Sequence, residues 1–134
     1  MWDREMGYES RTGAVLFATD VDLVATFYSA VLGLTEAGRA DDHILLESAG
    51  FQLVVHRIPG SRLTPGDGAP PVRRATAAFK PVFFVPSISR LRAIAEAHGG
   101  ALEAAEREWS FQGGKVCDGT DPEGNVIQLR EHAR

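Results

Sequence analysis

Two stretches of the chain repeat the same order of apolar and polar positions, at a constant offset of 67 residues. They read FATDVDLVATFYSAVLGLTE and FVPSISRLRAIAEAHGGALE. Each begins as a short apolar strand and continues with apolar residues three or four positions apart, the spacing of a helix that buries one face. Asp20 and Ser87 are typical N-cap residues. The pattern therefore predicts helices near 20–32 and 87–99.

Each predicted helix is followed by a glycine that favours a helix end, Gly33 or Gly100, and then by strand-like runs. The predicted strands lie at about 34–39, 43–47 and 51–57, and again at about 101–106, 114–119 and 125–130. A segment rich in Pro and Gly, 59–75, reads as a linker. The predicted fold is α+β, with two βαβββ modules at about 12–58 and 76–132. Because neither module buries both faces alone, we expect one curved mixed sheet around a cleft.

Length and composition narrow the class of protein. A chain of 134 residues with 44% hydrophobic residues is typical of one globular domain. The net charge of −4 and the scattered basic residues argue against nucleic acid as a partner. A single cysteine, Cys117, rules out an intramolecular disulfide and favours a reducing compartment. No apolar run has the length of a membrane span, and the first ten residues lack a signal-peptide core, so we expect a cytoplasmic protein without a membrane partner.

Two motifs carry a family resemblance: DVDLVATFYSAVLGL at 20–34 and DPEGNVIQL at 121–129. In this order, together with the repeat, they resemble the vicinal oxygen chelate superfamily, which includes glyoxalase I, bleomycin resistance proteins and extradiol dioxygenases. The resemblance covers nearly all of the chain after about residue 12. It implies paired βαβββ modules and usually a dimer, and we expect a homodimer, because modules of this size leave edge strands and apolar flanks to cover. It does not fix the chemistry, because this fold serves many activities.

Metal-dependent members of the superfamily hold a divalent ion on side chains from equivalent strands of the two modules. The resemblance places these positions at Gly13, Gln52, Lys80 and Gln128. Glycine offers no ligand, lysine offers a cation, and two neutral amides do not balance the charge of a metal ion. We therefore expect no metal and no cofactor at this position.

The same positions suit a small organic molecule. Gln128 interrupts an otherwise apolar strand, so it faces either water or the cleft. Glutamine both donates and accepts hydrogen bonds, and a lysine can hold an anionic group, unless it merely reaches solvent. An isolated histidine such as His56 is a ligand contact or a structural residue. Strand alternation places several apolar residues on the same face. The predicted ligand site consists of Gln52, His56, Lys80, Gln128, Phe17 and Phe84, with further walls from Val15 and Val82.

Three functions agree with these observations. The first, which the residues favour, is a metal-free protein that binds a small organic molecule in the cleft between the modules. The alternative is a lyase, isomerase or dioxygenase of the same superfamily with a diverged active site, for which the sequence indicates no catalytic residue. The third is a structural or regulatory dimer whose cleft has no ligand.

Overall fold

The first half of the chain folds as one βαβββ unit. The computed structural model describes residues 11–60 and 71–131. Its first unit consists of β1 (Thr12–Ala18), α1 (Val21–Leu32), β2 (Thr35–Ala40), β3 (His43–Ser48) and β4 (Phe51–Arg57). The four strands form a sheet in the order β1-β4-β3-β2, in which β1 and β4 are parallel and the other pairs are antiparallel.

The second half repeats this arrangement with two additional elements. It consists of β5 (Val82–Val85), α2 (Ile88–Ala97), β6 (Ala101–Leu102), the 3-10 helix η2 (Ala105–Arg107), β7 (Trp109–Phe111), β8 (Gly114–Thr120) and β9 (Val126–Glu131). The sheet order is β5-β9-β8-β6, and β7 also pairs with β8. The predicted α+β fold of paired βαβββ modules is confirmed. The strand predicted at about 101–106 is wrong in length, because β6 ends after two residues and the helix-favouring residues that follow form η2.

Both predicted N-caps are confirmed. A side-chain oxygen of Asp20 accepts a hydrogen bond from the backbone N–H of Leu23 at 3.1 Å, at the start of α1. The Ser87 hydroxyl accepts one from Arg90 at 3.4 Å, at the start of α2. Each cap satisfies a backbone donor that has no partner inside its helix, which is why the two helices begin where the sequence places them.

The two helices end on different glycines. Gly33 ends α1 in the left-handed conformation, with φ of 68°. After α2 the left-handed residue is Gly99, with φ of 89°, and not the repeat-matched Gly100. Gly100 meets a different requirement, because a Cβ atom there would lie only 2.3 Å from Cε2 of Phe27 on α1. The repeat therefore preserves the glycine, but its physical role differs between the modules.

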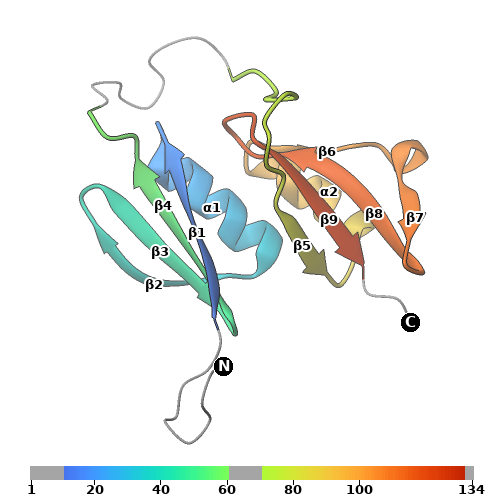
Figure 1. Ribbon diagram of the computed structural model, residues 1–134, viewed down its shortest axis with the longest axis horizontal. Coiled ribbons are helices and arrows are strands. Elements are labelled where there is room, and N and C mark those ends of the chain that lie inside the picture. Colours follow the sequence, from blue (N-terminus) through green and yellow to red (C-terminus); the bar gives the residue numbers. More distant parts are fainter. Residues whose placement is uncertain (1–10, 61–70, 132–134) are drawn as a thin grey trace, which may run out of the picture.

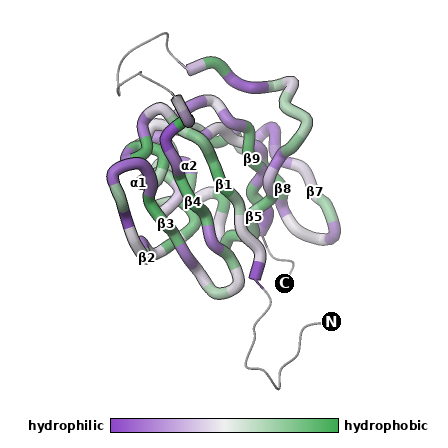
Figure 2. The backbone as a smooth tube through the Cα atoms, turned by 60° about the vertical axis from the view of Figure 1, so that its left-hand side comes forward, coloured by the Kyte–Doolittle hydropathy of each residue, from purple (hydrophilic) through white to green (hydrophobic). Residues whose placement is uncertain are grey.

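One hydrophobic core runs through both modules. It joins buried residues of α1, α2 and both sheets, among them Val24, Phe27, Leu53, Ile88, Ile127 and Leu129. Figure 2 shows how the hydrophobic residues follow the strands, while hydrophilic residues gather at turns. Within residues 11–60 and 71–131, neither helix is long and apolar enough to cross a membrane.

The sheets meet side by side, with β1 and β5 as the edge strands nearest the junction (Figure 1). In the described part of the chain no strand ladder joins β1 to β5, so side chains make the junction. The ring of Phe83 on β5 lies edge-on to the rings of Phe51 and Tyr28, at centroid distances of 5.7 Å and 6.2 Å. Because the two sheets are joined by side chains and not by a strand ladder, space remains between the modules.

Candidate functional site

A buried carboxylate ties the second module to helix α1. Asp121, only 3% exposed, accepts a 2.8 Å hydrogen bond from the Tyr28 hydroxyl. It also accepts three more, from the side chain and backbone N–H of Asn125 and from the backbone N–H of Glu123. Burial, followed by the nearby Asp121 charge, raises the pKa of Tyr28 well above its ordinary value. Tyr28 is therefore a permanent donor at neutral pH and cannot act as a base.

A second carboxylate of the same turn, that of Glu123, caps helix α1 of the other module. The Glu123 side chain accepts hydrogen bonds from the backbone N–H groups of Thr19 and Asp20, at 2.7 to 3.0 Å. A negative charge at a helix N-terminus is favoured by the helix dipole and by the unpaired N–H groups there. The two sequence motifs that carry the family resemblance are therefore in direct contact.

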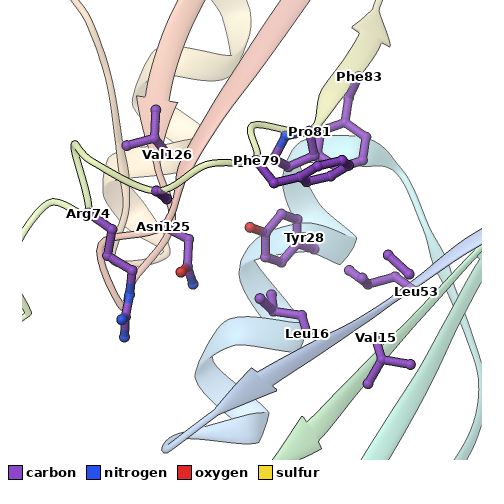
Figure 3. Close-up of a pocket in the computed structure, with 12 residues that line it drawn as sticks. Val15, Leu16, Tyr28, Leu53, Arg74, Phe79, Pro81, Phe83, Asn125 and Val126 are labelled. Carbon is purple, nitrogen blue, oxygen red and sulfur yellow. The ribbon is translucent and has the colours of Figure 1, made fainter.

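A cavity of about 210 Å³ lies beside this junction, between the modules (Figure 3). Strands β1 and β4 and helix α1 contribute walls from the first module, whereas β5, β9 and the preceding segments contribute walls from the second. Its lining residues are Ala14, Val15, Leu16, Tyr28, Leu53, Arg74, Ala77, Phe79, Pro81, Phe83, Asn125 and Val126. Most of these are apolar, so the cavity favours an apolar guest.

The polar groups of this cavity come mainly from one side. Figure 3 shows Arg74 and Asn125 on the side opposite Leu53 and Val15, with the Tyr28 ring between them. The segment that carries Arg74 is held in place, because its backbone N–H donates to the carbonyl of Gly124 at 2.8 Å. A bound molecule would therefore meet apolar walls along its length and a cation with an amide at one end.

The predicted residues of the second module lie together on the sheet face away from the core. Lys80 forms a 2.9 Å ion pair with Asp118. Gln128, 6% exposed, donates its amide N–H to the same carboxylate at 3.1 Å, and its carbonyl oxygen accepts a 2.8 Å bond from Arg130. The Arg130 guanidinium lies over the ring of Phe84, 6.0 Å from its centroid. We call Lys80, Asp118, Gln128 and Arg130 the polar chain of the second module.

The predicted residues of the first module have other partners. Gln52 donates its amide N–H to Glu47 at 2.7 Å. His56 directs Nδ1 at the backbone carbonyl of Arg57, at 2.6 Å, and its ring meets Phe17 edge-on at 5.9 Å. Among the described residues, no hydrogen bond or ion pair joins Gln52 or His56 to Lys80 or Gln128. The six-residue ligand site stays a prediction, and of the predicted wall residues Val15 lines the inter-module cavity.

Gln52 and Gln128 stand in the similar triplets FQL (51–53) and IQL (127–129), which suggests that they are counterparts in the two modules, but strand register does not match them. Gln52 lies beside Gly13, whereas Gln128 lies beside Val82. Val82 matches Val15 at the offset of 67, and Val15 lies beside Val54. The structural counterpart of Gln128 is therefore Val54, and the two glutamines occupy different positions in their sheets.

Sequence reasoning missed two members of the polar chain. Arg130 is two residues after Gln128 on β9, so alternation alone places it on the same face. Asp118 is directly opposite Gln128 in the β8–β9 ladder, which only the strand register reveals. In the cavity, Arg74 and Ala77 lie in a stretch without regular structure, where no periodicity marks them.

The four residues that the resemblance assigns to the superfamily's metal position, Gly13, Gln52, Lys80 and Gln128, are a poor set of ligands for a divalent ion. Gly13 has no side chain, and the Lys80 ammonium lies in the polar chain next to Gln128. The only oxygen of the Gln128 side chain already accepts from Arg130, so a metal ion there would face two cations and a single carboxylate, that of Asp118, which already pairs with Lys80. Neutral amides and cations do not stabilise a divalent ion, and we derive no chemistry through a metal at this position.

A family model described as a glyoxalase-like domain matches residues 13–130. This chain belongs to the glyoxalase-like domain family. The resemblance to the vicinal oxygen chelate superfamily is thereby confirmed. No curated protein has a matching sequence.

Solved structures share the fold of this glyoxalase-like chain at low sequence identity. A glyoxalase/bleomycin resistance protein/dioxygenase family enzyme from Burkholderia phytofirmans PsJN is 18% identical, with a TM-score of 0.67 over 92% of this chain and 98% of that one. The fosfomycin resistance protein FosX from Listeria monocytogenes is 13% identical, with a TM-score of 0.65 over 94% and 95%. A glyoxalase-related enzyme from Fulvimarina pelagi is 18% identical, with a TM-score of 0.62 over 93% and 89%.

Proposed function

We propose that this glyoxalase-like protein binds a small organic molecule in the cavity between its two modules. The observation that carries the proposal is the cavity itself, whose apolar walls come from both modules and whose polar groups are few. A dry apolar cavity of about 150 Å³ already holds a benzene ring. The cavity of about 210 Å³ is therefore large enough for one ring with a small substituent.

The polar end of the cavity defines the ligand further. Arg74 supplies a permanent cation with several N–H donors, and Asn125 supplies an amide. The Tyr28 hydroxyl is already engaged with Asp121, so it contributes mainly the face of its ring. The best-fitting ligand has a flat apolar body and one acceptor or anionic group directed at Arg74. That the fold also occurs in a fosfomycin resistance protein is consistent with a small-molecule role.

The predicted residues on the sheet faces remain the second place for a ligand. There, the Lys80 cation is balanced by Asp118, and Arg130 is the further cation of the polar chain. A ligand on this face would lie near Phe84 and Phe111, because the Arg130 guanidinium lies over both rings. The alternative of a lyase, isomerase or dioxygenase stays a prediction, and neither Tyr28 nor the superfamily's metal position supplies its chemistry.

A thermal-shift screen with monocyclic aromatic acids and their neutral analogues tests the proposal. A molecule that binds only the native state raises the apparent Tm. We expect Ala14→Leu, which fills part of the cavity, to weaken binding of a hit at least tenfold. Ala40→Leu is the matched control, since Ala40 is exposed on β2 and does not line the cavity. Equal loss in both variants, or no Tm rise with any compound, would contradict the proposal.

Two variants test whether Arg74 holds the anionic group of the ligand. Arg74→Ala should weaken the binding of an aromatic acid by about tenfold or more, which is the usual cost of losing a charged hydrogen bond. Arg73→Ala is the neighbouring control, because Arg73 pairs with Glu103 and does not line the cavity. The neutral analogue should bind both variants equally.

A further inference from the structure

Three potential metal ligands meet on the sheet of the first module, away from the inter-module cavity. Asp42 lies in the turn between β2 and β3, His43 begins β3, and His56 lies opposite it on β4. One ligand atom from each residue can be chosen so that all three lie within 4.8 Å of one another. The two imidazole rings stack almost in parallel, with centroids 5.8 Å apart and an interplanar angle of 5°.

The Asp42 carboxylate bridges the two rings. One oxygen lies 2.8 Å from Nδ1 of His43, and the other lies 3.4 Å from Nε2 of His56. The backbone fixes this turn, because the N–H of Arg57 donates to the carbonyl of Asp42 at 2.7 Å. The three side chains are therefore held on neighbouring backbone segments rather than on one mobile loop.

The orientation of His56 matches that of a metal ligand. Its Nδ1 lies 2.6 Å from the carbonyl oxygen of Arg57, and only a protonated ring nitrogen donates to a carbonyl. In the neutral ring, Nε2 then carries the free lone pair, and this nitrogen faces Asp42. Metal-binding histidines typically donate their other ring N–H to a carbonyl or carboxylate in this way.

Ligand spacing requires only a small adjustment. Bonds of about 2.0 Å at tetrahedral angles put the ligands of a zinc ion roughly 3.3 Å apart. The widest permitted separation here, 4.8 Å, closes by rotation of partly exposed side chains. Two imidazoles and one carboxylate suit Zn²⁺, Ni²⁺ or Cu²⁺ better than Mg²⁺ or Ca²⁺, which prefer sets of oxygen ligands.

We propose that Asp42, His43 and His56 form a site for one divalent transition-metal ion of the Zn²⁺ type. Three protein ligands leave one coordination position open to solvent, as in zinc sites that also bind water or a small ligand. The site does not use any of the four positions that the superfamily resemblance assigns to a metal. The edge-on ring of Phe17 against His56 gives the site an apolar border.

Calorimetric titration of the full-length, metal-free protein with ZnCl₂ tests this site. We expect one equivalent to bind, and each of His43→Asn, His56→Asn and Asp42→Asn to weaken the affinity at least tenfold. His98→Asn is the matched control, because His98 lies at the end of α2 and contacts the carbonyl of Ile94. Binding of Co²⁺ gives a second readout, a d–d absorption band that the His56→Asn variant should lose.

Two results would overturn the proposal. One is the absence of saturable binding at one equivalent in the unaltered protein. The other is unchanged zinc affinity in both His43→Asn and His56→Asn, with circular dichroism showing that the variants are folded. In that case the stacked histidines and Asp42 serve only to join β3, β4 and the turn.

Discussion

The phenolic oxygen of Tyr28 lies 2.8 Å from a carboxylate oxygen of Asp121, 93 residues further along the chain. Tyr28 belongs to the helix of the first module and Asp121 to the last turn of the second. This contact joins the two family motifs, and Tyr28 also lines the cavity between the modules. The motifs are therefore explained by the assembly of the modules, whatever molecule the protein binds.

The first prediction concerns the stability that this contact supplies. Tyr28→Phe removes one of four hydrogen bonds to a buried carboxylate and should lower the free energy of unfolding by about 1.5–3 kcal/mol. Urea denaturation at neutral pH measures the change. Thr26→Val is the control on the same helix, since its exposed hydroxyl only donates to the carbonyl of Asp22. A Tyr28→Phe variant as stable as the control would show that the contact contributes little.

The second prediction is a pH dependence at the alkaline end. Burial beside Asp121 raises the pKa of Tyr28 above the 10.0 of an unperturbed tyrosine. Above pH 10 the unfolded chain loses this proton while the folded chain keeps it, so rising pH favours unfolding. Above pH 10, the free energy of unfolding should therefore fall more steeply with pH than in Tyr28→Phe, by an extra amount that approaches about 1.4 kcal/mol per pH unit. Free energies of unfolding, measured at several pH values from 9 to 11 and plotted against pH, should therefore converge for the two proteins. Parallel plots would refute the raised pKa.

The third prediction separates two kinds of glycine. Gly33 and Gly124 both have positive φ. A Cβ atom added at Gly124 would lie 2.2 Å from the carbonyl oxygen of Val72, whereas a Cβ atom added at Gly33 would have no described heavy atom within 4 Å. Gly33→Ala should cost about 1–2 kcal/mol for its left-handed backbone alone. Gly124→Ala should cost at least about 1 kcal/mol more, because the clash displaces the segment before Arg74. Equal losses in thermal or chemical unfolding would contradict this docking of the segment.

The fourth prediction is a homodimer. Large apolar side chains are exposed on the sheet faces away from the core, including Phe17 at 50%, Phe111 at 49% and Val15 at 57%. A second copy of the chain would cover such surfaces. The aromatic N-terminal segment around Trp2, also expected to contribute, lies outside the described residues. Sedimentation equilibrium at micromolar concentration should give twice 14.5 kDa; a single monomeric species would disprove the dimer.

The sequence alone predicts both helices and most of the strands, because their signals are local. Asp20 and Ser87 mark helix starts through bonds to residues three positions away, and apolar periodicity marks the buried faces. It was less informative where two requirements compete, as at Gly100, which the repeat marks as a helix end but the Phe27 ring requires for packing.

The candidate site was harder to predict because it depends on register and on contacts distant in sequence. The sequence identifies Gln128 as a polar residue in an apolar strand, but its partner Asp118 follows only from the β8–β9 pairing. Glu123 caps a helix more than one hundred residues away, and spacing within one segment contains no sign of that contact. The cavity likewise combines residues from segments that only the tertiary fold brings together.

The central claim is that a small molecule binds between the modules, and intermolecular NOEs from a bound aromatic acid to methyl groups test it most directly. The account predicts NOEs to Leu16, Leu53 and Val126, which line the cavity, with binding weakened by Arg74→Ala. Saturable binding with NOEs only to Val54 and Val82 on the sheet faces, and weakened by Lys80→Ala instead, would contradict the account and favour the site predicted from the sequence.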